Sequence, residues 1–155
     1  MTDLVKIEKS LSTIDVSKLV PFTKKIHEIG HGFNPMLAPI YLRDFIIAYD
    51  IATVMYATAT KADIMAKAAL EQAESIAFLE NAGPFIKESG LKDSAEARKK
   101  YIALDEGVKQ AQDTKAKTAA ILAFLKNKLQ VFRLAHDDVK KMAYTDQYQT
   151  DNEGM

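Results

Sequence analysis

A regular apolar pattern in the last third of the chain constrains the fold more than any other feature of the sequence. The pattern lies in the stretch from Asp105 to about Ala143, and in the second half of that stretch apolar side chains recur at alternating spacings of three and four residues. Such spacing draws one stripe along a single helix face, as in a coiled coil. Asp105 can cap a helix that begins at Glu106, and no proline follows, so we expect one helix of roughly 55 Å. The seam positions are Leu122, Leu125, Leu129, Phe132, His136 and Val139.

A helix of that length cannot bury its stripe alone, and the segment from about Pro39 to Asn81 supplies a partner. Its apolar positions, again three and four residues apart, are Leu42, Phe45, Tyr49, Ala52 and Tyr56. Gly83 and Pro84 are expected to end this helix. The pattern predicts an all-α fold in which two long helices form an antiparallel, coiled-coil-like hairpin. Further apolar residues fall off the stripe, so we also expect a homo-oligomer.

Two short helices are expected ahead of the hairpin, from Asp3 to Leu11 and from Ser17 to Ile29. Glycines and prolines between residues 30 and 39 form the connection to the first long helix. We therefore expect a short N-terminal helical unit over residues 1–35, the hairpin over residues 36–143 and a polar tail over residues 144–155.

Composition limits the classes of partner. The chain has 21 basic and 21 acidic side chains, so no net field attracts nucleic acid or an anionic membrane, and such binding needs a local basic patch. Cysteine is absent, which suits a reducing compartment. No signal peptide or membrane span is expected, because the most apolar stretch, from Phe45 to Thr60, is shorter than about 20 residues and contains Asp50. We expect a cytoplasmic protein.

One motif suggests an enzyme. His27, Glu28 and His31 match H-E-x-x-H, which in zinc peptidases supplies two metal ligands and a general base. A third ligand cannot be identified, and Gly30 weakens the helix inside the motif. No nucleophile elbow, phosphate loop or dinucleotide fingerprint is present either. We expect no catalytic residues, metal or cofactor, and keep a zinc metallopeptidase as a remote alternative.

A basic cluster lies between the two long helices. Five basic residues are accompanied by two aromatic rings, a combination that can follow a phosphate backbone and stack bases. The other interpretation is a solvated surface of mixed charge, since three acidic residues are interleaved with the cluster. The candidate nucleic-acid-binding residues are Lys87, Lys92, Arg98, Lys99, Lys100, Phe85 and Tyr101.

Three stretches of the chain carry a family resemblance. They are residues 77–83 (Ala-Phe-Leu-Glu-Asn-Ala-Gly), residues 94–108 with Arg98, Tyr101 and Asp105, and the apolar helix that follows to Met142. Together they resemble the recombination mediator proteins of T-even-type phages, over about residues 40–142. In that family the segment before the glycine break carries DNA-contacting basic residues. Here Glu71 and Glu74 occupy that segment, which moves the expected contacts to residues 87–100.

The resemblance implies a non-enzymatic phage protein of the host cell cytoplasm that forms rings and binds single-stranded DNA. Its implied partners are a recombinase, which it helps to load, and the single-strand-binding protein that covers the DNA. The alternative is a helical structural or assembly protein, such as a virion component or a partner-binding hairpin, that binds no nucleic acid.

Overall fold

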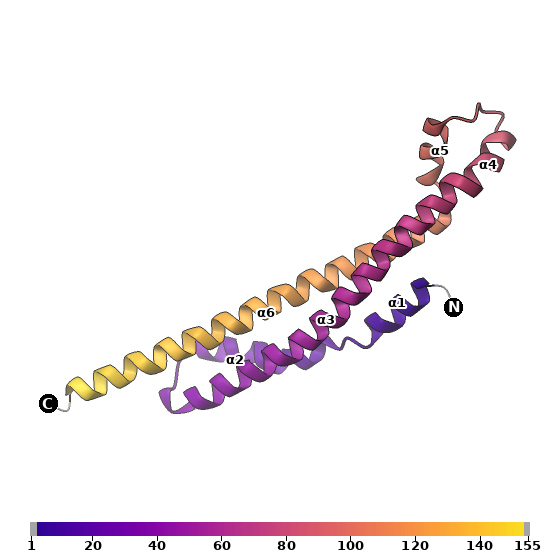
Figure 1. Cartoon of the computed structure of the whole chain (residues 1–155). Coiled ribbons are helices and arrows are strands. Elements are labelled where there is room, and N and C mark those ends of the chain that lie inside the picture. Colours follow the sequence, from indigo (N-terminus) through magenta and orange to yellow (C-terminus); the bar gives the residue numbers. More distant parts are fainter. Residues whose placement is uncertain (1–2, 154–155) are drawn as a thin grey trace. The chain divides into compact units, whose positions relative to one another are not determined.

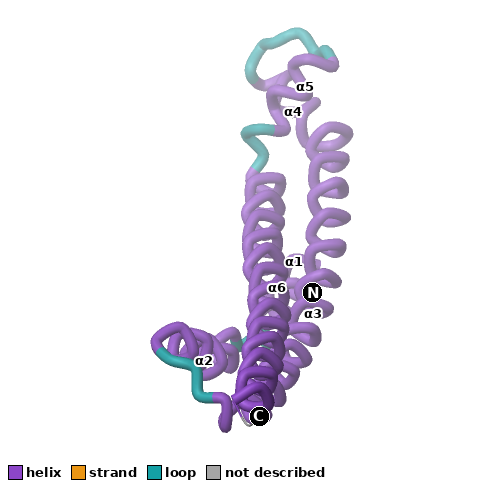
Figure 2. The backbone as a smooth tube through the Cα atoms, turned by 90° about the vertical axis from the view of Figure 1, so that its left-hand side faces the viewer, coloured by secondary structure: helices purple, strands orange, loops and turns teal. Residues whose placement is uncertain are grey.

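The computed structural model describes residues 3–153, with side chains up to residue 145. Every regular element in that range is helical, which confirms the all-α prediction (Figure 2). The two long helices, α3 and α6, run antiparallel and pack against each other, which confirms the hairpin (Figure 1). The α-helices are α1 (Asp3–Ser12), α2 (Val20–His31), α3 (Ala38–Ile76), α4 (Ala82–Glu88), α5 (Ala95–Ile102) and α6 (Glu106–Glu153). Two short 3₁₀ turns, Val16–Leu19 and Pro35–Leu37, and a π turn, Ala77–Asn81, connect them.

The chain forms two compact units, and both long helices contribute to each. Unit 1 comprises residues 1–14 and 58–122, and therefore holds α1, the second half of α3, α4, α5 and the start of α6. Unit 2 comprises residues 15–57 and 123–155, with α2, the first half of α3 and the rest of α6. This grouping differs from a division at residue 35, because α1 and α2 pack in different units.

Burial along α6 follows a seven-residue period from Ala111 onward, and Val108 and Thr114 near its start are buried as well. The most deeply buried position of each heptad is at most 1% exposed, and these positions are Ala111, Thr118, Leu125, Phe132 and Val139. Leu122, Leu129 and His136, at the other seam position, are half-buried. One seam row thus faces the partner helix directly, while the other lies at its edge.

Only two of the five residues expected in the seam of α3 are fully buried. Phe45 and Ala52 are fully buried, but Tyr49 is 40% exposed and Leu42 and Tyr56 are only half-buried. The fully or almost fully buried row is Ala38, Tyr41, Phe45, Ala48, Ala52, Met55, Ala59, Ala62 and Ala66. Alanine has no side chain beyond Cβ, so a row of alanines lets two helices pack closely while larger apolar side chains cover the flanks.

Unit 1 contains a polar layer within the seam. Thr118 is fully buried, and its hydroxyl lies 2.9 Å from a carboxylate oxygen of Asp63 on α3. Lys115 Nζ donates to the same oxygen at 2.6 Å. The hydrogen bond from Lys115 lowers the pKa of Asp63, and the bond from Thr118 adds to this against the effect of burial. Nearby, Ile7 of α1 packs on Ala62 and Ala66.

Unit 2 is a three-helix arrangement. Phe22 of α2 meets Phe132 of α6 edge-on, with ring centroids 6.3 Å apart. Lys25 of α2 forms an ion pair with the buried Asp44 of α3. This hydrogen bond from Lys25 lowers the pKa of Asp44, overcoming the effect of burial. The apolar and ionic contacts together hold α2 against both long helices.

The expected break at Gly83 and Pro84 is wrong. The chain stays helical from α3 through the π turn and α4 to Glu88. A proline ring normally clashes with the carbonyl four residues earlier, which here belongs to Glu80 inside the π turn. A π turn takes in one extra residue per turn and therefore offers room for that ring.

The end of α6 also differs from the expectation, because the helix continues past residue 143 to Glu153. Among the described residues, none of the helices combines the length and the apolar run that a bilayer crossing requires.

Candidate functional site

The candidate site is the hairpin tip, which we define as residues 77–105. Within it, α4 ends where Gly90 adopts a positive φ of 68° and Leu91 N–H donates to the Ile86 carbonyl at 3.1 Å. This geometry is typical of a helix that ends on glycine. Helix α5 then starts behind Ser94, whose hydroxyl accepts from Ala97 N–H at 3.2 Å. Asp93, one residue before this cap, pairs instead with another side chain.

That partner is Arg98, which holds the tip together. Its guanidinium donates to both carboxylate oxygens of Asp93, from Nε at 2.8 Å and from Nη2 at 2.7 Å. Nη1 donates to the Phe78 carbonyl in the π turn at 2.7 Å. A Cβ at Gly83 would lie 3.3 Å from Nη2, so glycine leaves room for the guanidinium there. Arg98 thus connects α5 to the π turn, and all three of its donor nitrogens have protein partners.

The same contacts set the charge states of this pair. The hydrogen bonds from Arg98 lower the pKa of Asp93, and those bonds raise the pKa of Arg98. Both groups stay ionised around neutral pH. A phosphate could bind Arg98 only by competing with a bidentate carboxylate.

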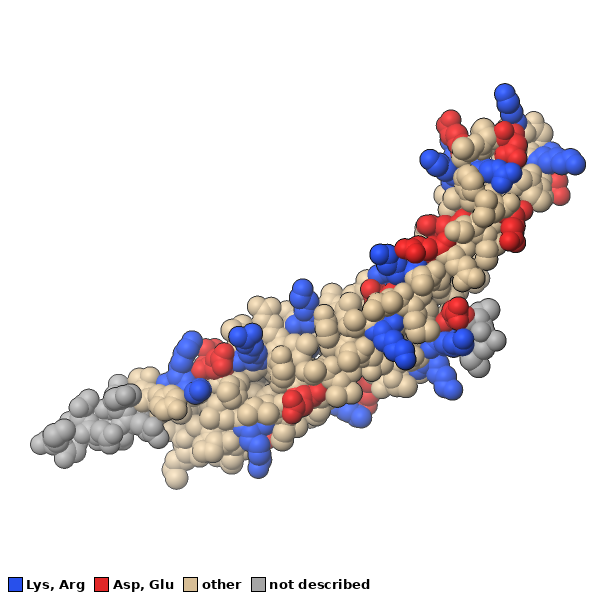
Figure 3. Space-filling view, viewed as in Figure 1, with Lys and Arg blue, Asp and Glu red and all other residues tan. Residues whose placement is uncertain are grey.

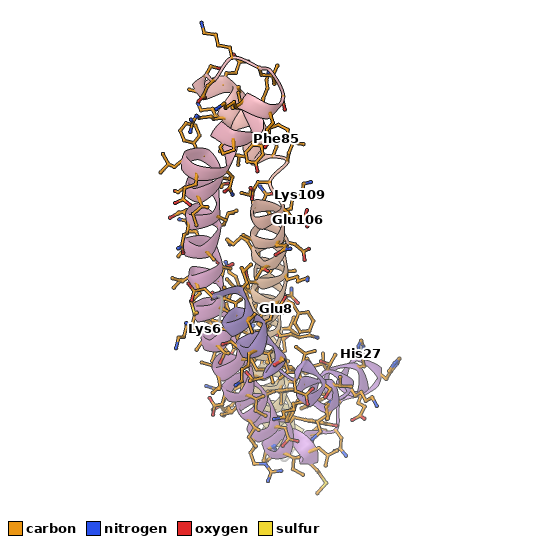
Figure 4. The ribbon with its side chains drawn as sticks, turned by 90° about the vertical axis from the view of Figure 1, so that its right-hand side faces the viewer. Lys6, Glu8, His27, Phe85, Glu106 and Lys109 are labelled. Carbon is orange, nitrogen blue, oxygen red and sulfur yellow. The ribbon has the colours of Figure 1, made fainter. Side chains whose placement is uncertain are left out.

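The tip also contains an aromatic pair. The rings of Phe85 on α4 and Tyr101 on α5 have centroids 4.9 Å apart and planes tilted by 41°. Phe85 is 42% exposed, whereas Tyr101 is half-buried. Figure 4 shows Phe85 beyond the start of α6, which Glu106 and Lys109 mark. A ring that is supported on one side and open on the other can stack a flat ligand.

The aromatic pair lines a cavity of about 360 Å³ together with two lysines. Lys92 belongs to the loop between α4 and α5, and Lys100 lies one residue before Tyr101. Lys100 Nζ forms an exposed ion pair with Glu96 Oε1 at 3.2 Å. Exposed pairs of this kind contribute little energy, so Lys100 can exchange its partner for a phosphate. The apolar lining includes Leu91 and Leu104, which are 60% and 59% exposed.

The structure separates the remaining lysines from that cavity. Lys99 lines a different cavity of about 460 Å³, alongside Glu71, Glu74 and Phe78. Lys87 is exposed on α4 and lines neither cavity. Of the seven predicted residues, the fold therefore brings together Phe85, Lys92, Lys100 and Tyr101. Figure 3 shows basic and acidic side chains mixed over the visible face of the tip.

Asp105 joins the tip to α6. One carboxylate oxygen caps α6 by accepting from Val108 N–H at 3.1 Å, as the sequence predicted. The other oxygen accepts from Asn81 Nδ2 and from the Tyr101 hydroxyl, each at 3.2 Å. Burial opposes ionisation of Asp105, but the hydrogen bonds from Val108, Asn81 and Tyr101 outweigh it and lower its pKa. Burial and the adjacent carboxylate both raise the pKa of Tyr101. The hydrogen bond from its hydroxyl to Asp105 holds the ring beside Phe85.

Two further predicted features lie in unit 2. His136 borders a groove of about 350 Å³ with Phe45, Tyr49 and Arg133. His27 and His31 are exposed at the end of α2, and Figure 4 shows His27 projecting outward. Within the part of the chain that the structure describes, no three His, Cys, Asp or Glu side chains form a group able to hold a metal ion.

Sequence reasoning missed a larger cavity in unit 2, of about 510 Å³. Its lining comes from the 3₁₀ turn Val16–Leu19, from the first turns of α2 and from Phe124 and Lys128 on α6. Lys128 Nζ lies 5.5 Å from the Phe124 ring centroid and donates to Thr23 Oγ1 at 3.3 Å. The available sequence signal was weak, because residues 16–24 and residues 124–128 are remote in the chain.

Comparison of the chain with protein-family models, with curated proteins and with solved structures found no match.

Proposed function

We propose that this protein is a non-enzymatic accessory factor that binds single-stranded DNA at the hairpin tip. One observation supports this most directly: the Phe85–Tyr101 pair lines an open cavity with Lys92 and Lys100. Stacking on an aromatic side chain contributes about 1–3 kcal/mol per base and tolerates any sequence, while lysines attract the phosphates. No base-reading element accompanies them, so binding without strong sequence preference is expected.

The zero net charge of the chain makes one tip a weak site. A homo-oligomer would present several tips to one strand and multiply a weak local contact. The recombination mediators that the chain resembles bind single-stranded DNA as rings of this kind. We therefore extend the proposal to recombinase loading. The proposed partners are a recombinase and a single-strand-binding protein, in the cytoplasm of a phage host.

The test is fluorescence anisotropy of a labelled oligothymidine across a salt series. We expect Lys92→Ala/Lys100→Ala to weaken binding and to flatten the salt dependence by about 1.4 in slope, because each phosphate contact on a single strand contributes about 0.7. Phe85→Ala should weaken binding about 5- to 150-fold at any salt concentration. Circular dichroism would verify that each variant remains folded.

The matched control is Lys109→Ala/Lys117→Ala, which removes the same charge from exposed positions of α6. If this control weakens binding as much as the tip variant, the affinity reflects overall charge and the tip assignment is wrong. Arg98 should stay unchanged in these experiments, because its replacement would disrupt the tip itself.

A second function is favoured by a separate observation. Helix α3 exposes large apolar side chains, including Ile40, Ile47 and Val54, and the most basic tip residue is already paired with a carboxylate. Those features suit a structural or assembly protein that binds other protein surfaces. If the wild-type protein fails to bind the oligonucleotide even at low salt, this second function replaces the first.

A further inference from the structure

In unit 2, the first half of α3 carries an apolar row on the side away from its buried seam. Ile40, Ile47 and Val54 follow one another at seven-residue intervals and are 43%, 42% and 69% exposed. Seven residues are almost two helical turns, so the three side chains share one face. Successive turns of the same helix bury Tyr41, Phe45, Ala48 and Ala52, which lie on a different face.

Two opposite charges share that outer face. Arg43 and Asp50 are also seven residues apart, and each lies three or four residues from Ile47. The Arg43 side chain is 69% exposed, and its contact with Asp44 is long, at 3.4 Å, while Asp44 has its closer partner in Lys25. Asp50 is exposed and has no ion pair among the described residues. Each charge is therefore available to a partner outside the chain.

We propose that this face binds the same face of a second copy of the chain, with the two helices antiparallel about a two-fold axis at Ile47. Positions equally far from the axis then meet. Ile40 lies opposite Val54 of the second copy, and Arg43 lies within one residue of Asp50 of the second copy. Because the axis is two-fold, each of these contacts forms twice.

The charge pattern favours this occupant and this direction. A parallel, in-register pair would place Arg43 against Arg43 and Asp50 against Asp50, which is repulsive at both positions. The antiparallel pair converts the same residues into two attractive contacts. One helix face is small beside the roughly 1,200–2,000 Å² of a standard interface, so we expect dissociation in the micromolar range.

This inference rests on the self-association in the proposed function but not on DNA binding, since none of these residues belongs to the hairpin tip. Failure of the interface and failure of DNA binding are therefore measured by different experiments.

Disulfide trapping tests the geometry, and the native chain contains no cysteine to interfere. Ile47→Cys should form a covalent dimer under mild oxidation. Neither Ile40→Cys alone nor Val54→Cys alone should form a covalent dimer. In the proposed dimer each of these positions is 14 residues, about 21 Å along the helix, from the same position of the second copy. A disulfide spans only about 4.4–6.8 Å between Cα atoms. A mixture of the two variants should cross-link. Leu134→Cys, at an exposed position of α6, is the control that should stay monomeric.

Charge reversal tests the contacts by sedimentation equilibrium. Arg43→Glu alone and Asp50→Lys alone should each weaken the dimer about tenfold, because each change converts two attractive pairs into repulsive ones. The double variant should return to within about threefold of the wild type. A wild-type protein that stays monomeric at about 100 μM, 100-fold above the expected dissociation constant, would overturn the proposal. Efficient cross-linking of Ile40→Cys with itself would also overturn it, and so would a double variant that dimerises no more tightly than the single variants.

Discussion

Replacing Phe132 by alanine tests the packing of unit 2 most directly. The Phe132 side chain has no exposed surface, and it lies at the fully buried seam position of α6. Deleting a fully buried phenylalanine side chain costs about 3–5 kcal/mol, through lost transfer free energy and the cavity left behind. That is a large part of the 5–15 kcal/mol that typically separates folded from unfolded domains.

Part of that cost comes from the edge-on contact with Phe22, whose ring centroid is 6.3 Å away. Aromatic pairs of this geometry contribute about 0.5–1.5 kcal/mol beyond the area that they bury. A double-mutant cycle with Phe22→Ala should therefore show a coupling of that size. Urea unfolding followed by circular dichroism at 222 nm, at one fixed protein concentration, measures all four free energies of unfolding.

Leu134→Ala is the matched control, because Leu134 is two residues away on the same helix but 52% exposed. Its free energy of unfolding should change by no more than about 0.5 kcal/mol. A cost below about 1 kcal/mol for Phe132→Ala, or an equal cost for Leu134→Ala, would show that Phe132 is not a core residue of this unit.

Three further predictions concern unit 1. Asp63 has a folded-state pKa below its unfolded value of about 3.9, so its ionised form stabilises the fold above that pH. The free energy of unfolding should therefore be constant from about pH 7 to pH 5 and should fall in more acid solution, as pH drops through the folded-state pKa. Asp63→Asn should make the acid limb of a pH–stability curve shallower, and an unchanged curve would contradict this. Asp105→Ala should lower the free energy of unfolding by about 0.5–2 kcal/mol through loss of the α6 cap, with faster amide exchange at Val108 as the site-specific measurement. Gly90→Ala should destabilise by about 1–2 kcal/mol, because the backbone there has φ of 68° while nothing crowds the new methyl group, and a neutral result would mean that the loop takes another conformation.

The sequence by itself determined the helical class and the pairing of the long helices. Apolar spacing of three and four residues is a property of one helix and is read directly from the chain, so the α6 seam was predictable down to Leu125, Phe132 and Val139. Local chemistry was equally readable at Asp105, because a helix cap depends on a few neighbouring residues.

Only the tertiary structure decided which of several apolar rows on α3 is buried. Residues 42–56 offer apolar side chains on more than one face, and the choice of an alanine-rich row depends on how closely α6 approaches. At the tip, too, only the tertiary structure distinguished the basic residues from one another. Arg98 donates to Asp93 and to a carbonyl of the π turn, although in sequence it looks like its lysine neighbours. Lys92 and Lys100 instead lie beside the aromatic pair. Such contacts join residues about 5 to 20 positions apart, and their geometry depends on turns whose backbone conformation no local residue pattern specifies.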